Sequence, residues 1–242
     1  MPLRIAFDLD GVLADMDAEL VRHAEALFGE AMTRKLEERA SDHENAKRPA
    51  LKQDDDGVST VGPLHMTARQ TRRLWNHVQS VQDFWLGLKE NEPGAVARLA
   101  TVAAERRWEV IFLTKRPDTA GATAQTQSQR WLESNGFALP SVYVVQGSRG
   151  RIAAALDLDI VVDDRPGSCL DVVVDSKARA ILVWRRDEKQ LPKTARRLGI
   201  GVVTSVNECL DILTQVDEPA NSRPGLVDRV MTLLGLKETA RA

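Results

Sequence analysis

The stretch Leu3-Arg-Ile-Ala-Phe-Asp-Leu-Asp-Gly-Val-Leu13 is a short apolar run that passes directly into two aspartates and a glycine. A run of this length is typical of a strand that is buried on both faces of a parallel sheet. In an open parallel sheet, ligands bind outside the carboxyl ends of the strands. We therefore expect Asp8, Asp10 and Gly11 at the edge of the sheet where an active site forms.

Five further apolar runs follow, and helix-length segments separate the later ones. The runs cover residues 110–113, 142–145, 160–162, 181–184 and 202–204. Alternating strands and helices predict an α/β fold, with a parallel sheet between two layers of helices. The capping box Ser205-Val-Asn-Glu208 predicts a helix directly after the last strand, so the sheet domain is expected to end near Leu213.

The composition is that of an ordinary soluble globular protein, with 43% hydrophobic and 28% charged residues in 242 positions. A net charge of -2 provides no basic field, so a nucleic-acid polymer is not expected as a partner. No run of about 18 apolar residues is present, and no membrane association is expected. Two cysteines without a CxxC motif predict core thiols and fit a cytoplasmic location.

Two more predicted strands end in residues that suit phosphate or metal chemistry. Thr114 and Lys115 offer a hydroxyl, backbone N–H groups and a positive charge for a phosphate. Asp163 and Asp164 add two carboxylates at the same edge. Each motif alone is also compatible with a turn or a helix cap. Together with the end of the first strand, these residues predict a single site that binds both phosphate and a metal.

Two other enzyme classes are excluded. The sequence contains neither the glycine motif of a phosphate-loop kinase nor, after its first strand, that of a dinucleotide oxidoreductase.

At these motifs the sequence resembles the haloacid dehalogenase-like (HAD) phosphohydrolases. Asp8-Leu-Asp-Gly-Val-Leu13 is similar to the first family motif, Thr114 to the second and Asp163-Asp164 to the fourth. The resemblance implies a Rossmannoid three-layer α/β/α core, with a small helical cap inserted after the first strand. It also implies Mg²⁺-dependent hydrolysis of small phosphomonoesters through an aspartyl-phosphate.

The resemblance implies a role for each motif residue. Asp8 would be the nucleophile, and Asp10 the general acid and base. Thr114, Lys115 and the backbone near Gly11 would hold the phosphate oxygens.

Magnesium would be bound by the carboxylates of the first and fourth motifs. Asp8 and Asp163 would be direct ligands, the backbone carbonyl of Asp10 would contact the metal, and Asp164 would support its shell.

The third family motif is usually a lysine, whereas the spacing to Asp163 places Arg149 there. Arginine keeps the positive charge and can bind a phosphate through two nitrogens, but it is bulkier and planar. Lys115 and Arg151 are the alternative sources of this charge.

The predicted domains follow from this reading. The core comprises residues 1–17 and 93–213, and the cap comprises 18–92. Within the cap, 33–56 is highly charged and is predicted to be a flexible loop, with a solvated helix as the alternative. Residues 214–242 are predicted to form a linker and an amphipathic C-terminal helix.

The sequence more narrowly resembles the 5'(3')-deoxyribonucleotidase branch, through DLDGVLAD at 8–15, Phe84-Trp85 before Glu92-Pro-Gly-Ala95, and Val162-Asp-Asp-Arg-Pro166. This implies nucleoside or deoxynucleoside 5'-monophosphates as substrates, with Phe84 and Trp85 stacking on the base. The alternative is that these rings only hold the cap to the core.

Two other functions stay open. One is a phosphatase of sugar or other metabolite phosphates, because the cap would choose the substrate. The other, from a different class, is a phosphate-binding regulatory module with weak turnover, which Arg149 and the charged loop favour. The sequence leaves the oligomeric state open.

Overall fold

The structure is a computed structural model that describes residues 2–45, 58–61 and 64–216. Its contacts divide the described chain into two units. The first contains residues 2–14, 90–115 and 129–216, and the second contains residues 15–89 (as far as described) and 116–128. We describe each unit by itself.

The first unit is built on a six-stranded sheet with the order β5-β4-β1-β6-β7-β8, in which every neighbouring pair is parallel. The strands are β1 (Arg4–Asp8), β4 (Glu109–Thr114), β5 (Ser141–Val144), β6 (Ile160–Asp163), β7 (Arg179–Val183) and β8 (Gly201–Val203). The chain builds the sheet outward from β1 to β5, then returns to β6 on the other side of β1. Such a reversal is where open α/β sheets bind ligands.

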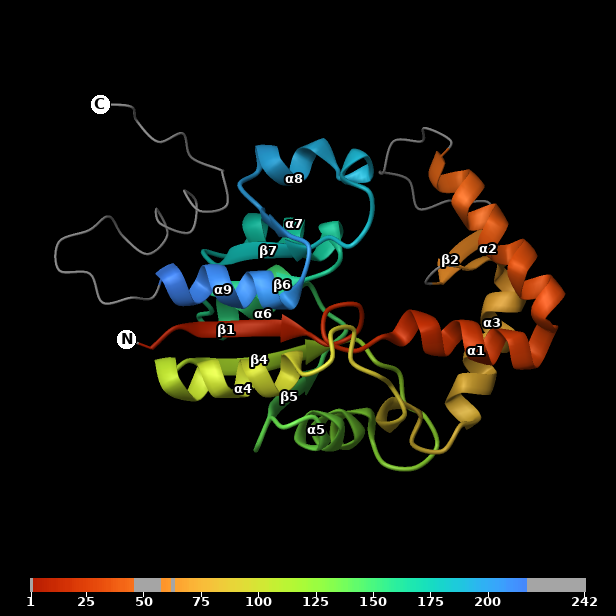
Figure 1. Cartoon of the computed structure of the whole chain (residues 1–242), viewed down its shortest axis with the longest axis horizontal. Coiled ribbons are helices and arrows are strands. Elements are labelled where there is room, and N and C mark those ends of the chain that lie inside the picture. Colours follow the sequence, from red (N-terminus) through yellow and green to blue (C-terminus); the bar gives the residue numbers. More distant parts are fainter. Residues whose placement is uncertain (1, 46–57, 62–63, 217–242) are drawn as a thin grey trace. The chain divides into compact units, whose positions relative to one another are not determined.

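Helices cover both faces of this sheet. Figure 1 shows α4 (Ala95–Arg106) and α9 (Val206–Val216) in front of the sheet, and α6 (Arg149–Ala155) and α7 (Pro166–Asp175) behind it. Helix α7 packs on β6 and β7, and α4 packs on α9. All residues of β6 are buried, as two covered faces require. The predicted α/β fold, with a parallel sheet between two layers of helices, is confirmed.

The remaining elements of the first unit are short. The 3-10 helix η2 (Glu188–Gln190) and helix α8 (Lys193–Arg197) connect β7 to β8. Helix α5 (Ala124–Ser134), between β4 and β5, spans the boundary between the two units. No helix within the described ranges combines the length and the apolarity needed to cross a membrane.

The second unit combines helices with a small hairpin. Its elements are α1 (Met16–Phe28), α2 (Glu30–Asn45), the antiparallel pair β2 (Val58–Val61) and β3 (Leu64–Thr67), α3 (Ala68–Ser80) and the 3-10 helix η1 (Phe84–Leu86). Asp15 caps α1 by accepting from the Ala18 N–H at 3.0 Å. Thr67 and Gln70 form a capping box at the start of α3. The hairpin was not predicted from the sequence.

For the first part of 33–56 the flexible loop is wrong and the alternative of a helix holds, because α2 continues to Asn45. Helix α2 contains neither glycine nor proline and is rich in alanine, glutamate, arginine and other helix formers. High charge density therefore does not indicate a loop by itself, because a charged segment made of residues with high helix propensity can form a helix. Residues 46–57 and the predicted tail helix within 217–242 lie outside the described residues.

The second unit also takes in residues 116–128, which the sequence assigned to the core. The reason is a set of hydrogen bonds to the region around η1. Trp85 donates from its backbone to Oε1 of Gln127 at 3.0 Å and from Nε1 to the carbonyl of Pro117 at 3.0 Å. The Ala122 N–H donates to Asp83 at 2.9 Å.

Candidate active site

The loop that follows β1 carries the first two aspartates of the site. Asp8 ends β1, and both Asp8 and Asp10 are buried, with exposed fractions of 7% and 9%. The N–H groups of Leu13 and Ala14 both donate to the carbonyl of Leu9, at 2.9 and 2.8 Å, and close the loop tightly. The loop therefore holds the two carboxylates at the carboxyl end of β1.

Three carboxylates meet at this edge of the sheet. Asp8, Asp163 and Asp164 each offer one oxygen, and these oxygens lie within 4.8 Å of one another. They meet because β1 and β6 are neighbouring parallel strands whose carboxyl ends lie side by side. Asp163 is further fixed by the Arg165 N–H, which donates to Oδ1 at 2.8 Å. The structure thus brings together three of the four predicted metal-binding residues.

Gly11 allows the close approach of Asp164. A Cβ atom at Gly11 would lie 2.2 Å from Oδ2 of Asp164, and the glycine has a φ of +84°. Only glycine adopts this conformation readily and leaves this space. Gly11 is therefore next to the carboxylate cluster, as predicted from its motif.

Arg149 supplies the positive charge within the cluster. It is the first residue of α6, and only 2% of it is exposed. Its Nη2 donates to Oδ1 of Asp8, and its Nε donates to Oδ2 of Asp163 at 3.4 Å. Its Nη1 is buried and has no hydrogen-bond partner within the described chain. The alternative candidate, Arg151, lies two residues further along α6 and is exposed.

Another glycine brings α6 close to α7. A Cβ atom at Gly150 would lie 2.0 Å from the carbonyl oxygen of Asp171 in α7. Two helix backbones can approach this closely only where a side chain is absent. Because Gly150 follows Arg149, this contact fixes the backbone from which the guanidinium reaches the carboxylates.

The cluster has an excess of negative charge. Burial raises the pKa of Asp8 well above its usual range, the charge of Asp163 raises it further, and Arg149 opposes both effects. Several buried carboxylates beside a single guanidinium need further positive charge for all of them to be ionised. Carboxylate oxygens are the ligands that Mg²⁺ prefers, so the donor set fits a magnesium ion.

Thr114 lies at the end of β4, on the other side of β1. It is fully buried, and its hydroxyl donates to Oδ2 of Asp10 at 3.2 Å. The next residue, Lys115, is exposed. The structure therefore places Thr114 against the predicted acid and base, and leaves the Lys115 side chain in solvent.

Phe84 and Trp85 lie in the interior of the second unit, with exposed fractions of 3% and 0%. Their rings contact each other edge to face, with centroids 4.8 Å apart. The guanidinium of Arg116 lies over the Trp85 ring, 4.8 Å from its centroid. Both rings are thus used in packing, and their burial gives no support to the predicted stacking on a base.

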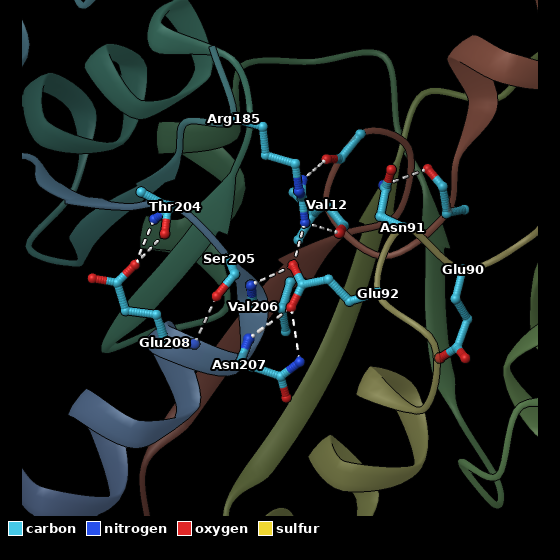
Figure 2. Close-up of polar contacts among 12 residues, drawn as sticks. Val12, Glu90, Asn91, Glu92, Arg185, Thr204, Ser205, Val206, Asn207 and Glu208 are labelled. Carbon is cyan, nitrogen blue, oxygen red and sulfur yellow. Dashed lines mark hydrogen bonds and ion pairs between the residues drawn. The ribbon is translucent and has the colours of Figure 1, made fainter. Parts of the chain in front are cut away.

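Sequence reasoning missed Arg185, which holds the loop after β1. Arg185 lies just beyond β7 and donates to the carbonyls of Gly11 and Val12 (Figure 2). It also pairs with Glu92, whose Oε1 lies 2.6 Å from Nη2. Arg185 directly follows the predicted strand 181–184, and this position at the carboxyl end of a strand could have indicated that it lies near the site.

Comparisons with known proteins found distant structural likenesses only. No family model and no curated protein matches the chain. A hydrolase from Pseudomonas syringae is 21% identical with a TM-score of 0.48, covering 90% of this chain and 100% of that chain. An L-2-haloacid dehalogenase is 12% identical with a TM-score of 0.43, covering 89% and 100%. CbbY from Rhodobacter sphaeroides, in complex with phosphate, is 16% identical with a TM-score of 0.38, covering 86% and 96%. At these values the likenesses carry no argument, and the fold and the site rest on the geometry of this chain.

Proposed function

We propose that this chain is a Mg²⁺-dependent HAD-like phosphatase that hydrolyses small phosphomonoesters through an aspartyl-phosphate. One observation carries the proposal: the oxygens of Asp8, Asp163 and Asp164 lie within 4.8 Å of one another, beside the buried guanidinium of Arg149. Phosphoryl transfer needs a nucleophile, a proton donor for the leaving oxygen, and positive charge around the transferring group. The site contains a candidate for each.

In the first step, a carboxylate oxygen of Asp8 bonds to the phosphorus, and the bond from phosphorus to the ester oxygen breaks. Asp10 gives its proton to that oxygen, and the alcohol leaves. Thr114 donates to Oδ2 of Asp10 and so fixes the orientation of the carboxyl group. Asp8 is held for attack by Arg149, and we assign Nη1 of the same guanidinium to a phosphate oxygen.

In the second step, Asp10 takes a proton from a water molecule as the water oxygen bonds to the phosphorus. The bond from phosphorus to the Asp8 oxygen breaks, which releases inorganic phosphate and restores the Asp8 carboxylate. Asp10 is protonated again and ready for the next substrate. The two steps thus use one acid and one nucleophile, and they consume only water and the ester.

Magnesium would be held by the carboxylates of Asp8 and Asp163 and by the backbone carbonyl of Asp10, with Asp164 supporting its shell. When bound, it would supply positive charge that stabilises the transferring phosphoryl group. The excess of buried carboxylate over guanidinium at this edge supports that assignment.

Nucleoside and deoxynucleoside 5'-monophosphates are the first substrates we propose, because the motif resemblance extends to that branch. Sugar and other metabolite phosphates are the alternative, since Phe84 and Trp85 are buried. A panel of both classes with purified protein and Mg²⁺ separates them. Hydrolysis of sugar phosphates alone would contradict the nucleotide proposal.

A cytoplasmic location is also part of the proposal, supported by two buried, free cysteines.

The reaction itself is tested by phosphatase assays of the wild type, Asp8→Asn and Arg151→Gln, with Mg²⁺ and with a chelator. Asp8→Asn keeps the side-chain shape but removes the nucleophile, so we expect no turnover. Arg151→Gln changes an exposed arginine on the same helix as Arg149 and should stay fully active. Activity that survives Asp8→Asn would refute the covalent mechanism. A folded wild type that binds phosphate and Mg²⁺ without hydrolysing any ester would favour the regulatory module.

A further inference from the structure

The four carbonyl groups of loop 11–14 all accept hydrogen bonds from two residues outside the loop. Arg185 donates to the first two carbonyls, and its Nη2 lies 3.0 Å from the Val12 oxygen. Asn91 donates to the last two, from its backbone nitrogen at 2.8 Å and from Nδ2 at 3.0 Å. The orientation of every peptide group in the loop is therefore fixed from outside.

Arg185 reaches the loop from a distant part of the chain. It follows β7, which is separated from β1 by β6, and its side chain extends to the loop after β1. Figure 2 shows its guanidinium between the loop and Glu92. The side chain of Arg185 is 30% exposed and that of Glu92 is 17% exposed, so the pair is only partly shielded from water.

Glu92 is itself held firmly. Its Oε1 accepts from the Val206 N–H at 2.7 Å, and its Oε2 accepts from the backbone and side-chain nitrogens of Asn207 at 3.0 and 2.9 Å. These donors belong to the first turn of α9, where a carboxylate is favoured by unpaired N–H groups. Arg185 thus bridges a fixed anion and the loop, and its guanidinium has little freedom to move.

We propose that Arg185 is a positioning residue for the phosphatase reaction, acting through the loop on Asp10. This inference rests on the proposed function. Asp10 precedes Gly11, whose N–H donates to the Ala14 carbonyl at 2.9 Å, but a glycine by itself leaves the peptide group on its carbonyl side more freedom than any other residue would. Arg185 removes that freedom by binding the Gly11 and Val12 carbonyls, and so keeps the Asp10 carboxyl beside Thr114.

The role of Asp10 gives this inference a specific signature. A leaving alkoxide needs a proton as the ester bond breaks, whereas a nitrophenolate leaves readily without one. Misplacing Asp10 should therefore slow the first step, reported by kcat/KM, much more for an alkyl phosphate than for p-nitrophenyl phosphate. Damage to the fold alone would slow both reactions by the same factor.

The test measures kcat and KM for glycerol phosphate and p-nitrophenyl phosphate, with Mg²⁺, in the wild type, Arg185→Met and Arg185→Lys. The matched control is Arg98→Met, because Arg98 also bonds to Asn207 in the first turn of α9 but has its ion pair with Asp211. In Arg185→Met we expect kcat/KM, which reports the first step alone, to fall about 100-fold on the alkyl ester and less than about 10-fold on the aryl ester. Arg185→Lys should recover part of the difference, and Arg98→Met should show none.

Glu92→Gln provides a second variant if Arg185→Met does not fold, which circular dichroism reports. It removes the charge that holds Arg185 but keeps the side-chain shape. We therefore expect the same selective loss on the alkyl ester, with a smaller fold-change than in Arg185→Met. Equal losses of kcat/KM on both esters would overturn the positioning role and leave the proposed function intact. A wild type that hydrolyses neither these esters nor any nucleoside 5'-monophosphate would refute the proposed function, and the inference would fall with it.

Discussion

Arg149, the first residue of α6, donates from Nη2 to Oδ1 of Asp8, the last residue of β1, and both side chains are buried. The same guanidinium reaches Asp163 at the end of β6. It therefore joins the helix layer to the carboxyl ends of two neighbouring strands. The negative charges of Asp8 and Asp163 are thus both paired with the Arg149 guanidinium.

Removing the guanidinium should destabilise the protein strongly when no metal is present. Arg149→Met leaves the buried carboxylates of Asp8 and Asp163 without their cation, which typically costs about 3–5 kcal/mol. Urea unfolding in a chelator measures the loss, and added Mg²⁺ should reduce it. Arg151→Met, on the exposed face of α6, is the control and should change stability by less than about 0.5 kcal/mol. A similar small effect in Arg149→Met would contradict the ion pairs.

Magnesium should stabilise the wild type but not a variant in which a proposed metal ligand, Asp163, is replaced. Binding to the folded chain alone adds about 2.7 kcal/mol when the ion is at about 100 times its Kd. Thermal unfolding with Mg²⁺ and with a chelator should show this increase in wild type and lose it in Asp163→Asn. Asp171→Asn, in α7 outside the cluster, should respond like the wild type. Equal responses in all three proteins would place the ion elsewhere.

Gly11→Ala should weaken the site more than it weakens the fold. The φ of +84° costs an alanine about 1–2 kcal/mol, and its Cβ would also lie 2.2 Å from Oδ2 of Asp164. Gly94→Ala is a close control, because Gly94 has a φ of +82° with nothing within 4 Å. Both variants should lose similar stability in urea unfolding. Only Gly11→Ala should weaken Mg²⁺ binding, by about 10-fold or more in calorimetric titration.

Gly150→Ala should push α6 away from α7 and displace Arg149. The added Cβ would lie 2.0 Å from a backbone oxygen of α7, and such overpacking costs about 1–3 kcal/mol. Gly167, in α7, has nothing within 4 Å, so Gly167→Ala should be neutral or stabilising by up to about 1 kcal/mol. Urea unfolding compares the two variants. A neutral Gly150→Ala would show that the helices separate freely.

The Glu92 network should make stability depend on pH in the acid range. Burial acts to raise the pKa of Glu92, but hydrogen bonds from Val206, Asn207 and Arg185 outweigh it and lower the pKa. The stabilisation is therefore complete above the pKa of the unfolded glutamate, about 4.3, and is lost as the pH falls through the lower folded value. Wild type should lose stability faster than Glu92→Gln in this window. Glu188→Gln, in an exposed pair with Arg196, should follow the wild type.

The sequence predicted the sheet and most of the site because both depend on local patterns. Apolar runs located β1, β4 and β6, and the polar residues that end them meet at one edge of a parallel sheet. The spacing before Asp163 also located Arg149. These inferences required only that the carboxyl ends of neighbouring strands lie together.

Long-range pairing explains what the sequence did not predict. Arg185 and Glu92 are 93 positions apart, and nothing near either residue indicates the other. Residues 116–128 join the second unit through bonds to Trp85, which composition does not reveal. The aromatic pair Phe84 and Trp85 was assigned to a substrate because of the resemblance to the nucleotidase branch, yet packing uses both rings.

The most direct test of the central claim is mass spectrometry of protein quenched in acid during turnover of p-nitrophenyl phosphate with Mg²⁺. The covalent mechanism predicts one phosphoryl group on the peptide that contains Asp8, accumulating further in Asp10→Asn because water is no longer activated. Asp8→Asn should carry no label and release no nitrophenol. Turnover without a phosphoryl group on Asp8, or full activity of Asp8→Asn, would contradict the mechanism.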